Sequence, residues 1–162
     1  MLIRPAADAD LEAILVIHND AILNSPAIWD DAPVDRSERE EWFAVRTTAG
    51  NPVLVVEDEG AVVGYGTYAP WRWKRGYRNT VEDSIYLAAS HQGRGIGRTL
   101  LTQLIDHARE AGHHVMLADI ESSNRASIGL HESLGFERVG QLNEIGQKFD
   151  RWLDLTILAL RL

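Results

Sequence analysis

The spacing of hydrophobic residues along the chain predicts alternating strands and helices. In the first third, a short strand at 2–4 is followed by two amphipathic helices. The first begins after Asp8 or Asp10, and the second begins at a capping box formed by Ser37 and Glu40 and is expected to end near Thr48. The segment 19–36 carries prolines and neither period, so it is expected to be irregular.

The rest of the chain predicts a sheet with one parallel crossover. A turn at 58–60 separates two β-branched runs, which indicates an antiparallel hairpin. Farther on, a strand, a long helix and another strand follow one another, and this order requires a parallel, right-handed connection. The expected strands are 52–57, 61–68, 80–88, 114–120, 136–142 and 149–160, and the expected helices are 96–112 and 124–135. The predicted fold class is α/β, with a mixed sheet that is antiparallel at both ends.

Composition narrows the class of protein. The 162 residues suit a single domain, 1–162, and no repeat or linker divides them. Cysteine is absent and no stretch of about 18 apolar residues occurs, so we expect a cytoplasmic protein that does not bind a membrane. A net charge of −8 disfavours nucleic acid as a partner, because nucleic-acid affinity comes mostly from Lys and Arg.

A glycine-rich turn after the strand 80–88 predicts an anion-binding site. Glycines stand at 93, 95 and 97, and the helix that follows offers backbone N–H groups without intrahelical partners. The dinucleotide pattern G-x-G-x-x-G fails because Arg98 stands where its third glycine would be, and the phosphate loop of nucleotide hydrolases fails because Gln92 replaces its first glycine. Taken alone, Gln92-x-x-Gly95-x-Gly97 is equally compatible with a plain helix-capping turn.

A second cluster, the basic loop at residues 71–78, gathers four basic and three aromatic side chains. Such a loop could be merely solvated, or it could stack and neutralise single-stranded nucleic acid. It could also hold an anionic acceptor, because guanidinium groups bind carboxylate-like oxygen pairs through two hydrogen bonds. The residues proposed for that anion site are Trp29, Arg72, Trp73, Arg75, Gly76 and Tyr77.

Two further motifs lie in register with the glycine turn. Asn124-Arg125-Ala126-Ser127-Ile128 and Leu130-His131-Glu132-Ser133-Leu134-Gly135-Phe136 follow it at the distance that is seen in GNAT N-acetyltransferases. More narrowly, Val81-Glu82-Asp83-Ser84-Ile85-Tyr86 and Gly146-Gln147-Lys148-Phe149-x-x-Trp152-x-Asp154 resemble the phosphinothricin and methionine sulfoximine acetyltransferases. The resemblance extends over nearly the whole chain.

The resemblance implies a GNAT fold in which two central parallel strands splay apart around acetyl-CoA. Its pyrophosphate would lie on the glycine turn, its pantetheine along the strand 80–88, and an amide near Leu87 would support the oxyanion. The residues implied to contact acetyl-CoA are Ile85, Tyr86, Leu87, Gln92, Gly93, Arg94, Gly95, Ile96, Gly97, Arg98, Asn124, Ser127 and Ser133. For Asn124 the alternative is a helix cap.

Acetyl transfer to an amine requires a group that removes a proton and a group that protonates the leaving thiolate. The resemblance implies Glu82 as the base, acting directly or through water, although a solvated carboxylate at a strand start would have the same sequence. His131 stands where many GNAT enzymes place a tyrosine acid, so it could be the acid or a packing residue. The histidines show no metal-ligand spacing, and we expect no metal.

The sequence therefore predicts an acetyl-CoA-dependent N-acetyltransferase. The acceptor is expected to be the α-amine of a small amino-acid-like compound of the methionine sulfoximine, methionine sulfone or phosphinothricin type. Transfer should be direct, because no cysteine is present to hold the acetyl group. The alternatives are a polyamine or a protein N-terminus as acceptor, and a non-catalytic acyl-CoA-binding module. The resemblance also implies a homodimer.

Overall fold

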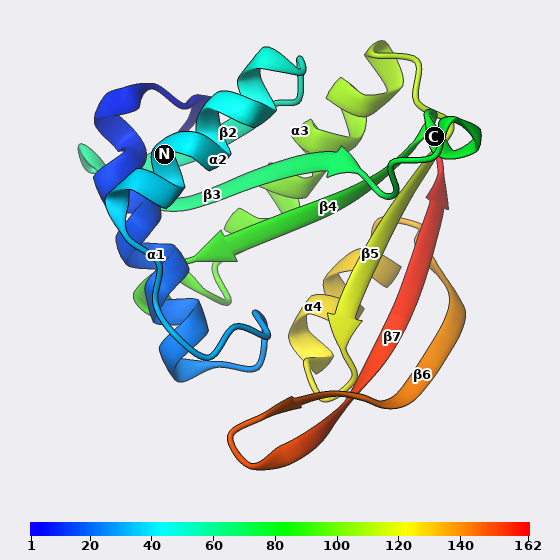
Figure 1. The fold of residues 1–162 in the computed structure, drawn as a ribbon. Coiled ribbons are helices and arrows are strands. Elements are labelled where there is room, and N and C mark those ends of the chain that lie inside the picture. Colours follow the sequence, from blue (N-terminus) through cyan, green and yellow to red (C-terminus); the bar gives the residue numbers. More distant parts are fainter.

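The computed structural model describes all residues from Met1 to Leu162 and contains one seven-stranded sheet in the order β1-β2-β3-β4-β5-β7-β6 (Figure 1). The strands are β1 Leu2–Pro5, β2 Val53–Asp58, β3 Ala61–Pro70, β4 Thr80–Leu87, β5 Val115–Glu121, β6 Glu137–Lys148 and β7 Arg151–Arg161. The α-helices are α1 Leu11–Asn24, α2 Arg36–Thr48, α3 Ile96–Glu110 and α4 Arg125–Glu132. Short 3-10 helices lie at η1 Asp8–Asp10, η2 Arg75–Tyr77 and η3 Ala89–His91.

Strand pairing confirms the predicted mixed sheet. The pair β4 and β5 is parallel, and every other pair in the sheet is antiparallel. The crossover from β4 to β5 runs through α3, as the order strand, helix, strand requires. The hairpin of β2 and β3 turns at Glu59 and Gly60, both at positive φ, which matches the two-residue turn typical of hairpins.

Helices cover the two faces of the sheet unequally. On one face, α3 and α4 bury the large core, in which Leu100, Leu101 and Leu104 pack against residues of the central strands. On the other face, α1 contributes Leu11, Ile14 and Ile17 to a smaller core over β2 and β3, with α2 packed beside it. Figure 1 shows that α1 and α2 leave the front of β5, β7 and β6 uncovered.

The structure corrects the predicted start of the second helix. Helix α2 begins at Arg36, and its N-cap is Asp35, whose carboxylate accepts the backbone N–H of Glu38 at 2.9 Å. The capping box predicted at Ser37 is therefore wrong by two residues. Aspartate is as good an N-cap as serine, and Asp35 is already in the extended conformation that the cap position requires.

The last two strands also differ from the prediction. Strand β6 extends to Lys148 instead of ending at 142, and Phe149 is not part of β7. Phe149 and Asp150 form the hairpin turn, with φ angles of +52° and +55°. Neither is the glycine or asparagine that usually marks such a turn, so this turn could not be predicted from the residues that form it. The four α-helices are all too short or too polar to cross a bilayer.

Candidate active site

The site is built where the two parallel strands separate. Strands β4 and β5 pair only through Thr80, Val81 and Glu82, opposite Val115 to Leu117. Beyond these three pairs β4 continues for five residues and β5 for four without pairing to each other. Both strands stay held on their other sides, β4 by β3 and β5 by β7. The result is a cleft whose walls carry free backbone groups.

Alternation along β4 decides which backbone groups face this cleft. The N–H of Ala88 donates to Val63 of β3, so residues in step with it, including Tyr86, bond toward β3. The intervening residues Ile85 and Leu87 present their N–H and C=O groups to the cleft. Consistent with this, the side-chain amide of Gln92 donates to the Leu87 carbonyl at 3.3 Å. Ile85 and Leu87, and not the Tyr86 backbone, can extend the sheet onto a ligand.

The glycine turn, residues 92–98, presents unpaired backbone N–H groups at the end of the cleft. None of the backbone N–H groups from Gly93 to Arg98 donates to a protein acceptor, and the last three belong to the first turn of α3. Gly93 and Gly95 have φ angles of +72° and +80°, and a Cβ at either would meet nothing within 4 Å. Six free amides at a helix N-terminus beside open space fit the pyrophosphate of acetyl-CoA.

Gly97 serves a different purpose from the other two glycines. A Cβ at Gly97 would lie 3.2 Å from Leu130 Cδ2 and within 4 Å of the Leu87 and Ile85 side chains. Its missing side chain therefore lets α3 approach α4 and β4 closely. The packing of α3 against α4 is thus sufficient reason for a glycine at position 97.

The polar side chains of the turn are partly engaged within the protein. Arg98 donates to the Ser133 hydroxyl at 2.6 Å and to its carbonyl at 3.2 Å, which ties α3 to the end of α4. Arg94 donates to Asp58 at 3.4 Å. The ligand-binding capacity of the turn thus comes mainly from its backbone.

Beneath the splayed strands lies a cavity of about 260 Å³. It is lined from β4, β5, α4 and the segment between α1 and α2, and its polar residues include four carboxylates. The lining residues are Ala27, Ile28, Glu82, Asp83, Ser84, Ile85, Tyr86, Ala118, Asp119, Ile120, Glu121, Asn124, Ser127 and His131. No group of three or more His, Asp or Glu side chains is arranged to hold a metal ion.

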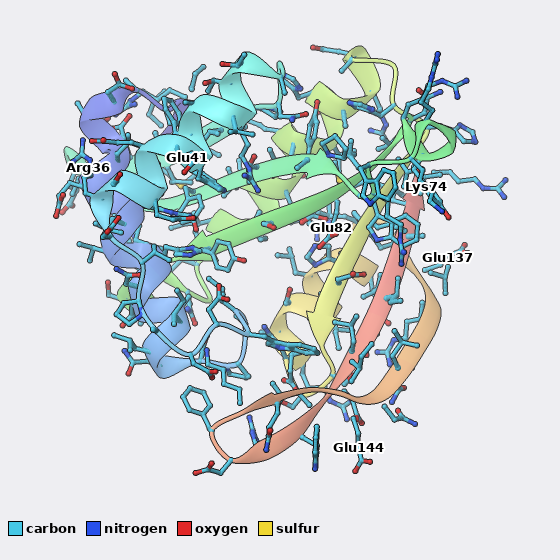
Figure 2. All side chains as sticks on the ribbon, viewed as in Figure 1. Arg36, Glu41, Lys74, Glu82, Glu137 and Glu144 are labelled. Carbon is cyan, nitrogen blue, oxygen red and sulfur yellow. The ribbon has the colours of Figure 1, made fainter.

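Glu82 has the electrostatic character of a base that works near neutral pH. Burial raises its pKa, and the negative charges of Asp119 and Asp83 raise it further, to about 7 from its usual 4.5. The side chain projects from the middle of β4, where the strand leaves β5 (Figure 2). A carboxylate with such a pKa takes and returns a proton readily at physiological pH.

His131 forms a buried pair with Asp83, a residue that sequence reasoning missed. Nε2 of His131 lies 3.1 Å from Asp83 Oδ2, and Nδ1 donates to the Ser127 carbonyl at 2.8 Å. Burial lowers the pKa of His131, but the hydrogen bond and charge of Asp83 outweigh it, and the net pKa is raised. Asp83 Oδ1 is buried with no hydrogen-bond partner. The pair can therefore keep a proton on the ring beside the cavity.

The comparisons with known proteins bear on this cleft. Residues 14–136 match the acetyltransferase (GNAT) family, and the matched range contains the splayed strands, the glycine turn and α4. The chain belongs to the GNAT family of acetyltransferases.

Several relatives of this acetyltransferase carry names that specify an acceptor. The chain is 52% identical over 162 residues to the L-amino acid N-acyltransferase MnaT of Escherichia coli (strain K12), covering 100% of this chain and 94% of the relative. It is 52% identical over 161 residues to the L-methionine sulfoximine/L-methionine sulfone acetyltransferase of Pseudomonas paraeruginosa, covering 99% and 94%. A phosphinothricin N-acetyltransferase of Alcaligenes faecalis is 36% identical, covering 96% and 80%.

Solved structures of similar sequence have the same fold. An acetyltransferase of Salmonella typhimurium, determined with acetyl-CoA, superposes with a TM-score of 0.97 at 51% identity, covering 99% of this chain and 93% of that one. A protein of Brucella melitensis described as a ribosomal-protein-alanine N-acetyltransferase superposes with a TM-score of 0.98 at 51% identity, covering 100% of both chains. The expected GNAT fold is confirmed.

The start of α4 contributes a helix cap to the GNAT cleft. Asn124 is the N-cap, and its side chain accepts the backbone N–H of Ser127 at 3.1 Å. Both residues line the cavity. Asn124 therefore caps the helix, which was the alternative interpretation of this residue. It also lines the cavity, so the capping role does not remove it from the site.

The basic loop lies at the closed end of the cleft, as the position of Lys74 relative to Glu82 shows (Figure 2). Arg72 is close enough to Asp119 of the cavity that its charge counteracts the raised pKa of that carboxyl. Trp73 is 90% exposed, and Arg75 and Gly76 are also exposed. Within this chain none of the loop residues lines the cavity.

Trp29 lies outside the cavity, although its neighbours Ala27 and Ile28 line it. Its indole N–H donates to the Pro26 carbonyl at 3.0 Å, and its ring packs against Gly146 of β6. The structure therefore brings Glu82, His131 and the cleft-facing part of β4 together, and it leaves Trp29 and most of the basic loop apart from them.

Proposed function

We propose that this GNAT acetyltransferase moves the acetyl group of acetyl-CoA to the α-amine of a small amino-acid-like acceptor, of the methionine sulfoximine, methionine sulfone or phosphinothricin type. The observation that carries the proposal is the position of Glu82, a base with a pKa of about 7, in the cavity at the end of the splayed strands. The names of relatives 52% identical over nearly their whole length support the choice of acceptor.

In the proposed reaction, Glu82 first takes a proton from the acceptor's ammonium group, directly or through water. The freed nitrogen lone pair attacks the thioester carbonyl, and a cleft-facing amide such as that of Leu87 donates to the oxyanion that forms. When the carbon–sulfur bond breaks, protonated His131 gives a proton to the sulfur and Asp83 keeps the ring oriented. The products are the N-acetylated acceptor and CoA, with one proton released to solvent.

A cationic acceptor is the second candidate, and one feature of the cavity favours it. Four carboxylates line the cavity and His131 is its single basic side chain, so a polyamine or a protein N-terminus would be attracted. The Brucella melitensis protein is described as acting on a ribosomal protein. An amino acid would need Arg72 or Arg75 to balance its carboxylate, with Trp73 and Tyr77 shielding the contact.

The decisive experiment is thiol release from acetyl-CoA with a panel of amines. Methionine sulfone, methionine sulfoximine, phosphinothricin, spermidine and a peptide with an N-terminal alanine would be compared by kcat/KM. We expect the amino-acid acceptors to have the highest kcat/KM values. We also expect methionine sulfone amide to react about 30-fold more slowly, since an unpaired charged partner costs about 2 kcal/mol. If spermidine or the peptide has the highest kcat/KM, the acceptor is cationic and the second candidate is correct. If no amine releases the thiol, the protein only binds acyl-CoA.

We also propose that the enzyme works as a homodimer in the cytoplasm. The uncovered front of β5, β7 and β6 supports this assembly. Leu155 and Ile157 alternate along β7 with Leu158, which faces the core under α3 and α4, so they point to the front, where they are only partly buried. Acetylation of the α-amine would remove the charge that these compounds share with ordinary amino acids. Protection of the cell from toxic analogues, herbicides included, is therefore the role we assign.

A further inference from the structure

Lys148, at the end of β6, is a buried lysine whose ammonium group makes all its hydrogen bonds to backbone oxygens and lies 4.9 Å from the centroid of the Phe149 ring. The residue is 4% exposed, and no carboxylate forms a salt bridge with its ammonium group. Nζ donates to the carbonyls of Ile22 at 2.5 Å, Ser25 at 3.0 Å and Ile28. An ammonium group has three N–H donors, so all of them are used.

These three carbonyls belong to the end of α1 and the segment that follows it. The last carbonyls of a helix lack intrahelical partners and carry the negative end of the helix dipole, which a cation stabilises. Lys148 therefore caps α1 from a strand 120 to 126 residues away in sequence. Figure 1 shows the β6–β7 hairpin reaching toward the lower end of α1.

A second contact joins the same two segments. A Cβ on Gly146 would lie 2.3 Å from the ring of Trp29, so only glycine allows the indole to pack on β6 at this distance. The indole N–H of Trp29 in turn donates to the Pro26 carbonyl, and this hydrogen bond holds the turn at residues 26–29 together. The two contacts explain the Gly146-x-Lys148 spacing, because residues two apart on a strand point to the same face.

Ala27 lies between Ser25 and Ile28, whose carbonyls Lys148 binds, and both Ala27 and Ile28 line the cavity that contains Glu82 and His131. We propose that Lys148 is a positioning residue for the acceptor: its ammonium group fixes the Ala27–Ile28 wall and so sets which acceptor side chains fit. This inference rests on the proposed function, since it assigns the wall to the acceptor. Acetyl-CoA binding should not depend on it, because the glycine turn lies on another part of the chain.

Burying an ammonium group without a carboxylate is a costly way to pack a hairpin. A methionine, which has a similar length, would fill the same space without the desolvation penalty of a buried charge. What a methionine could not do is bind three converging carbonyls. The lysine is thus suited to fixing the shape of this wall more than to stabilising the fold.

The test compares Lys148→Met with Gln147→Met, which places the same side chain at the adjacent exposed position of β6. For Lys148→Met we expect the KM of the best acceptor in the panel to rise about tenfold, kcat to stay within threefold, and the KM of acetyl-CoA to stay within twofold. The differences in kcat/KM among acceptors of different side-chain size should become smaller. Gln147→Met should match the wild type in all of these.

A measurement without substrates separates this inference from the proposed function. Hydrogen exchange of the amides at 25–31 should be at least tenfold faster in Lys148→Met than in Gln147→Met, with α3 unchanged. If Lys148→Met does not fold, Gly146→Ala tests the same wall by displacing Trp29. Unchanged acceptor KM, or unchanged exchange at 25–31, overturns the inference. A wild-type enzyme that acetylates none of the amino acids overturns the proposed function instead.

Discussion

At the scale of single residues, Glu82 is the side chain whose chemistry can be tested most directly. Only its carboxylate form accepts a proton, so the wild-type rate should rise with pH through about 7. Glu82→Gln keeps the shape of the side chain but cannot accept the proton. Turnover should fall by roughly 10²-fold and the rise with pH should disappear, while calorimetry should find acetyl-CoA binding retained.

A stability measurement serves as the control for Glu82→Gln. Because folding raises the pKa of this acid from 4.5 to about 7, the folded state binds more protons than the unfolded state between these pH values. The wild type therefore loses stability as pH rises across that window. The variant should resist denaturant better than the wild type at pH 8, with the advantage shrinking toward pH 4. Wild-type turnover in this variant would place the base elsewhere.

The pair of Asp83 and His131 gives a second prediction at this scale. In Asp83→Asn the burial that lowers the pKa of His131 remains, and the charge that raised it is gone. The pKa of His131 should therefore drop, which an NMR titration of the imidazole would measure in the substrate-free protein. At pH 7 the variant should also turn over more slowly, because a neutral ring is a weaker proton donor to the leaving sulfur.

The control for this pair is Asp119→Asn, which removes a cavity carboxylate that does not touch His131. It should leave the His131 titration close to that of the wild type. An equal His131 pKa in the wild type and Asp83→Asn would show that Asp83 does not set the charge of the ring. His131 also stabilises the fold through this pair, and that contribution is present below pH 6.5 and is lost as pH rises through the raised pKa.

At the scale of elements, the glycine turn can be separated into its binding and packing parts. Gly95→Val should raise the Kd of acetyl-CoA at least tenfold, since its Cβ would point into open space beside six free amides. The matched control is Gly112→Val at the other end of α3, which has the same positive φ and the same open surroundings. It carries the same backbone strain and should leave the Kd unchanged. Calorimetry on both variants decides whether the turn binds the pyrophosphate.

The elements themselves show what a sequence can and cannot predict. Periodicity located the seven strands and the four α-helices, because burial on one face imposes period 2 or 3.6 on the residues. It was wrong for residues 19–24, which were expected to be irregular but form the last part of α1. It missed the turn at Phe149 and Asp150, where tertiary contacts hold two residues at positive φ without glycine. It also could not distinguish Gly97 from Gly95, since a glycine needed for packing and one needed for ligand space look identical in sequence.

The site was predictable to the extent that its residues lie in local motifs. Glu82, the glycine turn and α4 belong to such motifs, and the strand order then brings them to one cleft. The contacts of Asp83 with His131 and of Lys148 with α1 span 48 and more than 100 residues. Nothing in the local pattern around either residue indicates its partner, so only the folded chain reveals these pairs.

At the scale of the whole molecule, the sheet is covered on one side more fully than on the other. The back is closed by α3 and α4, whereas the front is closed only over β2 to β4. The edge strand β6 adds exposed apolar side chains, including Val139, Leu142 and Ile145. An uncovered apolar sheet face next to an edge strand is a typical protein interaction surface. A second copy of this chain is the partner we expect there.

The prediction for this surface concerns Leu142, which is 42% exposed and pairs with Leu155 on β7. In a dimer formed through the front of β5, β7 and β6, Leu142→Asp would bury a carboxylate without a partner, and such a charge costs several kcal/mol. Sedimentation equilibrium should therefore find this variant monomeric at concentrations where the wild type is dimeric. Val45→Asp on α2, at a position 61% exposed and distant from this face, should leave the dimer intact. If Leu142→Asp and the wild type dissociate at the same concentration, the front of these three strands is not the interface.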